Sequence, residues 1–306
     1  MVNFSELVPE EKHRVLICCI MGLADSGVSS SYPNPLYKLG YSVEIMEGDS
    51  VSNSLGKSVA PDLVLVDAND NHAIIVECKS GQLGRDQIER YMGVKKEDLV
   101  DWGISSKDPR RLVHDVAFVA SYENSGNLMS TISREDIKCS FTGIVVNLVN
   151  IEKIKNNFNS MKVNNIFPVT ASLSKAPQYL YPIGRESPDF IIMDNLFPSL
   201  VSRLFLCECE EFENSIEDII IDLYPYWVEM GIDVKNKIKR NIIRVIEVAS
   251  KHSLLKNYIE YNDGIVKFKI HNFKNTRVLQ SFQRAGTEYI SILKRQYSQT
   301  RLSEWD

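Results

Sequence analysis

The sequence lacks several features that would place it outside ordinary cytoplasmic proteins. Its six cysteines include no Cys-x-x-Cys pair, and no His or Cys pair at zinc-finger spacing accompanies Cys207 and Cys209. This argues against a disulfide framework or a zinc finger. The apolar run 15–23 is too short to span a bilayer, and an acidic stretch precedes it instead of a basic one. We therefore expect a cytoplasmic protein without signal peptide or membrane segment.

The chain also lacks an excess of positive charge. Lysine and arginine number 35 against 40 aspartate and glutamate residues, which gives a formal net charge of −5. This composition argues against broad, non-specific coating of nucleic acid, although local basic patches still attract phosphate. With 306 residues, 44% hydrophobic and 25% charged, the chain is long enough for two domains or one large one.

Two short apolar runs dominate the N-terminal half. Residues 63–66 read Leu-Val-Leu-Val and residues 73–76 read Ala-Ile-Ile-Val, and both are bounded by polar residues. Asn69, Asp70 and Asn71 between them are typical of turns. The pattern predicts a β-hairpin.

The ends of this hairpin carry charges that a plain core strand would not need. Side chains alternate across a strand, so Glu77 and Lys79 share one face while Cys78 points to the other. Pairing across the turn brings Asp62 close to Glu77. Two carboxylates and the backbone carbonyl of Cys78 would offer oxygen ligands to a hard divalent cation. Lys79 would position or activate a water beside it, which is the equipment for metal-assisted phosphodiester hydrolysis.

Pro61-Asp62, then Glu77-Cys78-Lys79, resembles the motif of the PD-(D/E)xK nuclease superfamily, which has the restriction-endonuclease-like fold. Gln87 and Tyr91, one turn apart on a predicted helix, resemble the QxxxY motif of its RecB-like branch. The resemblance covers roughly residues 40 to 121. It implies that Asp62 and Glu77 bind Mg²⁺ or Mn²⁺, that Lys79 is catalytic, and that Gln87 and Tyr91 position substrate or active-site groups.

Further acids are candidates for the same site. RecB-like relatives often carry an acidic residue on their first helix, which corresponds here to Glu6 or Glu11. Glu44 and Glu47, on the predicted strand upstream of Asp62, are candidate accessory ligands. Each of the four also fits a solvated surface charge.

The order of the expected elements suits a restriction-endonuclease-like mixed central sheet flanked by helices. We assign residues 1–150 to this nuclease core and residues 151–213 to a connector or core extension. The expected elements are a helix at 4–24, a strand at 41–47, the hairpin, a helix at 84–100, a strand at 113–120, a short helix at 133–137, a strand at 143–149 and a helix at 151–158.

Residues 214–306 form a third, mostly helical region. Helices are expected at 215–227, 234–250 and 275–297, with a β-hairpin at 258–270 around Asn262-Asp263-Gly264. Helix, helix, hairpin and helix resembles a winged-helix module. In that case Lys237 and Arg240 would contact nucleic acid. The alternative is a helical cap with a solvated charged face.

The sequence thus points to a Mg²⁺- or Mn²⁺-dependent nuclease that hydrolyses DNA phosphodiester bonds, in a setting such as restriction or antiphage defence. The alternatives are a non-catalytic nucleic-acid-binding or interaction protein that keeps the nuclease fold, and an RNA-directed nuclease. The expected partner is nucleic acid, DNA rather than RNA, and not a membrane. The sequence leaves open whether the protein forms homo-oligomers or binds partner proteins.

Overall fold

The computed structural model describes residues 7–27, 32–133, 141–171, 173–206, 212–269 and 276–303. The chain divides into two compact units. The first combines Met1–Tyr181 with Val228–Val234, and the second combines Pro182–Trp227 with Lys235–Asp306. None of the helices within the described ranges has both the length and the apolar character that crossing a bilayer requires.

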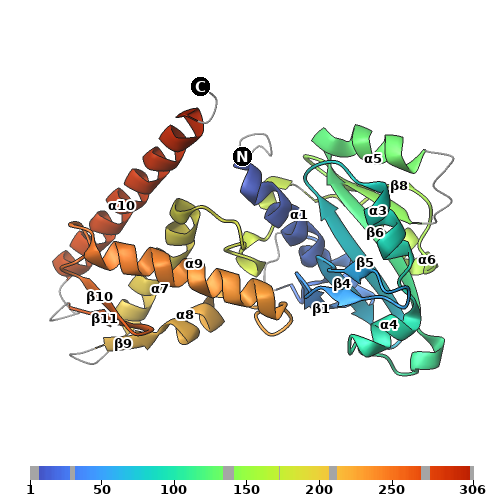
Figure 1. The fold of residues 1–306 in the computed structure, drawn as a ribbon, viewed down its shortest axis with the longest axis horizontal. Coiled ribbons are helices and arrows are strands. Elements are labelled where there is room, and N and C mark those ends of the chain that lie inside the picture. Colours follow the sequence, from blue (N-terminus) through green and yellow to red (C-terminus); the bar gives the residue numbers. More distant parts are fainter. Residues whose placement is uncertain are drawn as a thin grey trace. The chain divides into compact units, whose positions relative to one another are not determined.

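A mixed sheet of six strands forms the centre of the first unit (Figure 1). Its two central pairings, β5 with β6 and β6 with β7, are parallel, whereas the outer pairings are antiparallel. In spatial order the strands are β1 (Ser42–Met46), β4 (Leu63–Asp67), β5 (His72–Lys79), β6 (Val113–Ser121), β7 (Thr142–Val146) and β8 (Ile151–Lys155).

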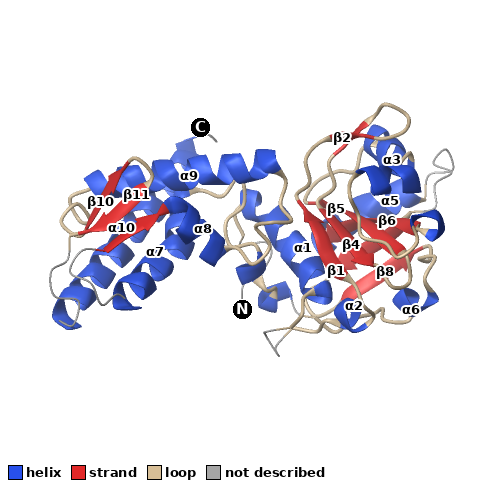
Figure 2. Cartoon of the chain, turned by 90° about the horizontal axis from the view of Figure 1, so that it is seen from below, coloured by secondary structure: helices blue, strands red, loops and turns tan. Residues whose placement is uncertain are grey.

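Helices cover both faces of this sheet, so the expected mixed sheet flanked by helices is confirmed (Figures 1 and 2). Helix α1 (Pro9–Ala24) packs on one face and is buried along most of its length because its residues 15–24 are almost all apolar. The opposite face packs against α3 (Arg85–Met92), α4 (Lys96–Asp101) and α5 (Ser125–Ile132). Both faces of the central strands are therefore buried, which explains their continuous apolar sequences.

The predicted hairpin is confirmed as β4 and β5. Asp67 pairs with His72 across the turn, and Leu63 pairs with Val76 at the open end. Asn71 takes a left-handed backbone conformation, with φ of 52°, that asparagine tolerates in turns. Continuing this register by one residue places Asp62 opposite Glu77.

Two expected helices differ in the structure. The helix expected at 84–100 is broken into α3 and α4 at Gly93, where a side chain would lie 2.9 Å from Leu55 Cδ1. The helix expected at 151–158 is wrong, because residues 151–155 form β8. There Ile151 is buried and pairs with Val146 of β7, and this tertiary pairing outweighs local helix propensity. The short helix expected at 133–137 lies mostly outside the described residues, and α5 precedes it.

The first unit continues past residue 150, into the stretch that we assigned to a connector or core extension. Arg14 of α1 donates to the Tyr181 carbonyl (2.5 Å) and to Gln178 Oε1 (2.7 Å), so residues 173–181 pack with the core. The smaller elements of this unit are α2 (Pro35–Lys38), β2 (Val51–Ser52), β3 (Ser58–Val59) and α6 (Met161–Asn164).

The second unit is mostly helical and holds a small three-stranded sheet in the order β10-β11-β9. The hairpin expected around Asp263-Gly264 is present, with positive φ at both residues. The sequence did not predict α7 or β9. The elements are α7 (Asp189–Leu206), β9 (Phe212–Ser215), α8 (Ile216–Leu223), α9 (Ile232–Lys251), β10 (Ile259–Asn262), β11 (Ile265–Phe268) and α10 (Thr276–Ser303).

The core of the first unit should depend strongly on Phe118. Its ring is fully buried on β6 and contacts Tyr91 and Phe141 edge-on. We expect Phe118→Ala to lower the free energy of unfolding by about 3–5 kcal/mol because it leaves a cavity. Val113→Ala, on the same strand but 45% exposed, should change it by less than about 0.5 kcal/mol. Urea unfolding of both variants tests this, and equal losses would contradict the packing described.

Candidate metal centre

The open end of the β4–β5 hairpin is fixed by Asp62. This residue precedes β4 and is 7% exposed, and its Oδ2 accepts a 2.6 Å hydrogen bond from the Cys78 backbone N–H of β5. Its carbonyl accepts from the Glu47 N–H at 2.7 Å. The Asp62 backbone and side chain therefore hold the ends of β1, β4 and β5 at one point.

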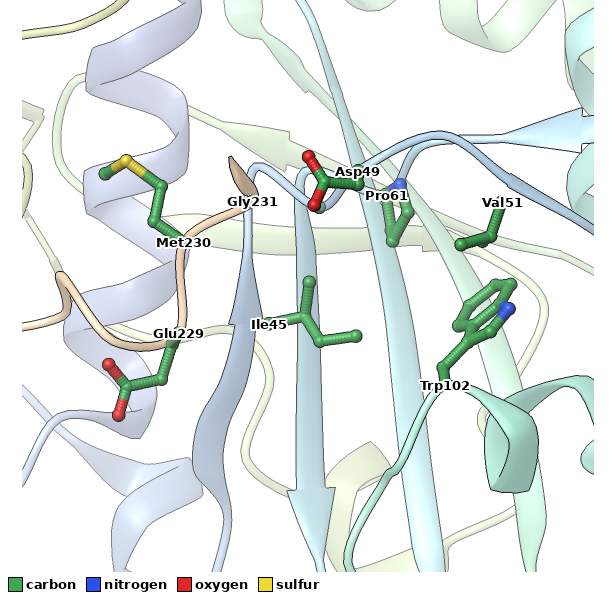
Figure 3. Close-up of a pocket in the computed structure, with 9 residues that line it drawn as sticks. Ile45, Asp49, Val51, Pro61, Trp102, Glu229, Met230 and Gly231 are labelled. Atoms are coloured by element: carbon green, nitrogen blue, oxygen red, sulfur yellow. The ribbon is translucent and has the colours of Figure 1, made fainter. Parts of the chain in front are cut away.

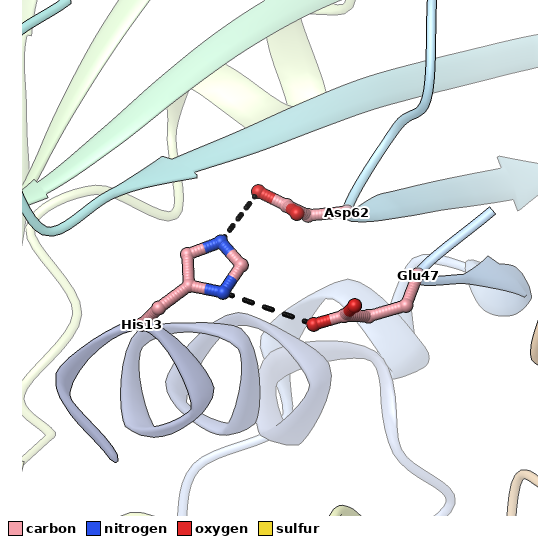
Figure 4. Close-up of side chains that lie close together, drawn as sticks. All are labelled: His13, Glu47 and Asp62. Carbon is pink, nitrogen blue, oxygen red and sulfur yellow. Dashed lines mark hydrogen bonds and ion pairs between the residues drawn. The ribbon is translucent and has the colours of Figure 1, made fainter. Parts of the chain in front are cut away.

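Three potential metal ligands meet at this point (Figure 4). His13 projects from α1 with Nε2 3.1 Å from Asp62 Oδ2 and Nδ1 3.7 Å from Glu47 Oε1. One ligand atom from each of the three residues lies within 4.8 Å of the others. Glu47 and Asp62 are buried, whereas the His13 side chain is 25% exposed. An imidazole and two carboxylates suit Mn²⁺ and related cations, and the carboxylates also suit Mg²⁺.

The position of Glu47 is fixed by its backbone. It follows β1 with φ of 44°, which is uncommon for a residue other than glycine. The Gly48 N–H donates to the Pro61 carbonyl at 2.8 Å, next to the bond between Glu47 and Asp62. From the other side Gly231 approaches so closely that a Cβ there would lie 2.5 Å from the Glu47 carbonyl oxygen. Contacts on both sides thus maintain the unusual conformation.

The other predicted site residues converge on Glu77. Its Oε1 contacts Lys79 Nζ at 2.6 Å and accepts from Gln87 Nε2 at 2.5 Å. The Tyr91 hydroxyl donates to Glu77 Oε2 and also contacts the Ala60 carbonyl, 2.7 Å away. Burial and Glu77 raise the pKa of Tyr91, which keeps its hydroxyl a donor. Glu77, Lys79, Gln87 and Tyr91 therefore form one network.

The charges of the His13–Glu47–Asp62 cluster and of the network around Glu77 influence each other. Burial, and then the nearby Asp62, raise the pKa of Glu77 to about 7, against the opposing effect of Lys79 and Tyr91. Burial by itself lowers the pKa of His13, but Asp62, Glu47 and Glu77 outweigh it and raise this pKa to about 9. In the protein without metal, His13 is thus an imidazolium that neutralises part of the acidic cluster. It must lose this proton to become a ligand.

The residues that the sequence analysis proposed as metal ligands lie in two different groups in the structure. Asp62 lies in the cluster with Glu47, which was one of the accessory candidates. Glu77 instead has both oxygens engaged by side chains, and Cys78 contributes its N–H to Asp62. A direct metal contact from Glu77 or from the Cys78 carbonyl stays a prediction.

The remaining candidate acids lie elsewhere. Glu44 accepts from the Ser105 N–H at 2.8 Å. Glu11 is buried and pairs with Arg14 at 2.5 Å, and Glu6 lies outside the described residues. His13 was missed because we sought only acids on the first helix. Its available signal was a metal-ligating side chain just before the apolar run of that helix.

The two basic residues expected to touch nucleic acid lie on α9 in the second unit. Lys237 pairs with Glu186, and the Arg240 Nε donates to the Asn236 carbonyl of its own helix at 3.3 Å. Lys239 and Arg244 pair with Glu217 and Asp189. Much of the positive charge on this helix is thus balanced within the unit.

Comparison with known proteins places the first unit in a family. The family model of the MJECL32 domain matches residues 12–181. The chain belongs to the MJECL32 domain family. It is 28% identical over 184 residues to "Uncharacterized protein MJECL32" of Methanocaldococcus jannaschii. That match covers 56% of this chain and 40% of the relative's length. No solved structure matches the chain. The matched region of this MJECL32-domain protein contains every residue of the candidate metal centre.

The raised pKa values predict how stability without metal depends on pH. Glu77 titrates at 4.5 ordinarily and at about 7 here, and His13 at 6.5 and about 9. Because both pKa values are raised in the folded state, the folded protein holds more protons, and stability should fall as pH rises from about 4.5 to about 9. Melting temperatures measured in EDTA across this range test the expectation. His13→Gln should flatten the fall above pH 6.5, and an unchanged slope would contradict the assignment.

Metal binding should depend on the three clustered residues. We expect His13→Ala and Glu47→Gln each to weaken Mn²⁺ binding at least about tenfold, since each removes one ligand. Glu44→Gln is the matched control, because Glu44 lies on β1, the strand that Glu47 follows, but hydrogen bonds to Ser105. Isothermal titration calorimetry measures the Mn²⁺ affinity of all three variants. Equal affinity of the His13 and Glu44 variants would remove His13 from the site.

Proposed function

We propose that this MJECL32-domain protein is a metal-dependent nuclease that hydrolyses phosphodiester bonds of DNA. One observation carries the proposal: a metal-ligand cluster of His13, Glu47 and Asp62 adjoins the Glu77–Lys79 ion pair at the open end of one hairpin. This arrangement supports the resemblance to PD-(D/E)xK nucleases that the sequence motifs suggested. Restriction or antiphage defence is the setting that this resemblance implies.

His13, Glu47 and Asp62 would hold the cation, with Glu77 and the Cys78 carbonyl as further candidate ligands. When bound, Mg²⁺ or Mn²⁺ would polarise the phosphate and lower the pKa of a water. The chain supplies the fixed geometry for this, because the ends of three strands and one helix meet at Asp62. Pre-oriented groups need little rearrangement when charge develops on the substrate.

Lys79 is the group proposed to act on the reacting atoms. Its side chain is 22% exposed, so it can reach substrate, and Glu77 holds its ammonium group at 2.6 Å. A fixed cation here would stabilise charge on the phosphate or orient the attacking water. Gln87 donates to the same Glu77 oxygen that Lys79 contacts, and Tyr91 donates to the other. In this proposal they position Glu77, and through it Lys79.

The second unit supports DNA as the substrate. Its element order is helix, strand, helix, helix, hairpin and helix, with the first strand joining the hairpin as a third. This order is compatible with the winged-helix resemblance seen in the sequence. Arg240 is exposed on α9, whereas Lys237 would have to leave Glu186 to contact phosphate.

Cleavage assays test the proposal directly. Single- and double-stranded DNA and RNA are incubated with the full chain and Mg²⁺, Mn²⁺ or EDTA. We expect metal-dependent cleavage of DNA. Lys79→Ala and Glu77→Gln should each lower turnover at least about a hundredfold. The first removes the cation that stabilises charge on the phosphate, and the second removes the carboxylate that holds Lys79 in place.

Glu89→Gln serves as the control for these variants. Glu89 lies on α3 next to the network but is 41% exposed and pairs with Arg85 and Lys57 on the surface. Its turnover should equal that of the wild type. Near-wild-type cleavage by Lys79→Ala, or no cleavage by the wild type with either metal, would refute the proposed function. Cleavage of RNA but not of DNA would show that the substrate is RNA.

A further inference from the structure

A pocket of about 220 Å³ opens beside the candidate metal centre in the first unit (Figure 3). In Figure 3 the Trp102 indole, Val51 and Pro61 lie on one side, and Glu229 and Met230 on the other. Its lining consists of Ile45, Gly48, Asp49, Val51, Pro61, Trp102, Glu229, Met230 and Gly231. The predicted hydrolysis mechanism uses none of these residues.

The pocket and the metal ligands share the same two chain segments. Gly48 directly follows Glu47, and Pro61 directly precedes Asp62. The 2.8 Å hydrogen bond from the Gly48 N–H to the Pro61 carbonyl joins these two segments. A ligand in the pocket would therefore contact residues that directly adjoin Glu47 and Asp62 in the chain.

The lining suits an uncharged ligand with an apolar face. Most of it is apolar, and the two ionisable side chains among the lining residues are acidic. Both Asp49 oxygens are engaged by the Ile232 and Asp233 N–H groups, at 2.8 and 2.9 Å. With two carboxylates and no cation in the lining, the pocket is unfavourable for a phosphate.

Trp102 supplies a preformed aromatic surface. Trp102 is the C-cap of α4, and its backbone N–H donates to the Asp98 carbonyl at 2.9 Å. Its side chain is partly buried against the core, as is that of Ile45. An apolar cavity of about 150 Å³ accommodates benzene. A pocket of about 220 Å³ therefore has room for one heteroaromatic ring system, but not for a whole nucleotide.

We propose that this pocket takes one unpaired nucleobase of the substrate strand, stacked on Trp102, while a neighbouring phosphate of the same strand lies at the metal centre. The inference rests on the proposed nuclease function and specifies its substrate class. A paired base is enclosed by its stack and partner, so only single-stranded or locally unpaired nucleic acid can place a base here.

The test measures binding of single-stranded DNA oligonucleotides to the Lys79→Ala variant of the full chain with Mg²⁺. Each position of the oligonucleotide is replaced in turn by an abasic unit. We expect an abasic unit at one position, next to the phosphate that the wild type cleaves, to lower the affinity about tenfold. This is the effect of losing one stack between an aromatic side chain and a base. Duplex DNA of the same sequence should bind at least about tenfold more weakly.

Trp102 is then changed in the same background. Trp102→Ala should bind the intact strand about tenfold more weakly and lose its sensitivity to that abasic position, whereas Trp102→Phe should keep most of both. Val100→Ala is the matched control, since Val100 lies on the same helix and is 40% exposed outside the pocket. The abasic series in the unaltered pocket does not depend on whether Trp102→Ala folds.

The outcomes separate this inference from the proposed function. A flat abasic series, equal affinity for duplex, or identical behaviour of the Trp102 and Val100 variants overturns the base pocket, even if the wild type cleaves DNA. Base-dependent binding without cleavage supports the pocket and refutes the nuclease. Failure to bind any nucleic acid overturns both.

Discussion

The hydrogen bond from the Cys78 N–H to the Asp62 carboxylate is the contact on which the arrangement of the site depends. It extends the β4–β5 pairing by one position beyond the last strand pair and places a buried carboxylate opposite Glu77. The same Asp62 holds the end of β1 through its carbonyl and meets His13 of α1 through its side chain. Four elements, α1, β1, β4 and β5, therefore share one anchor.

Such an anchor requires compensation, because buried carboxylates are costly unless they are paired or bind a cation. The chain offsets this cost with separate partners for the two groups of carboxylates. His13 faces Glu47 and Asp62, while Lys79, Gln87 and Tyr91 surround Glu77. Burial and the nearby Asp62 raise the pKa of Glu77. Burial lowers the pKa of His13, but the three nearby carboxylates raise it above its ordinary value. A divalent cation at the cluster, as proposed, would offset this concentration of negative charge.

The segment 228–231 shows how a distant part of the sequence completes the same region. Met230 forms a bridge to Met46 at the free edge of β1, and Gly231 packs directly on the Glu47 backbone. The segment fixes the strained Glu47 and at the same time forms the wall of the pocket opposite Trp102 (Figure 3). Ligand geometry and pocket shape are thus coupled through one short stretch.

The sequence by itself determined the hairpin and the network around Glu77, because both arise from local patterns. Two apolar runs joined by the polar turn Asn69–Asn71 predict the β4–β5 hairpin, and the register of that hairpin brings Asp62 and Glu77 together. Helical spacing puts Gln87 and Tyr91 on one face toward the sheet. The sheet flanked by helices also followed from the order of such patterns.

Only the tertiary structure decided which residues join Asp62 and what surrounds them. His13 and Glu47 come from separate elements, and their approach depends on how α1 packs on the sheet and how the chain turns after β1. Residues 151–155 became a strand because β7 offered an edge to pair with. The pocket needs residues 229–231 beside Trp102, a long-range contact that no local pattern encodes. Local propensity specifies elements, whereas packing between distant elements specifies which side chains meet.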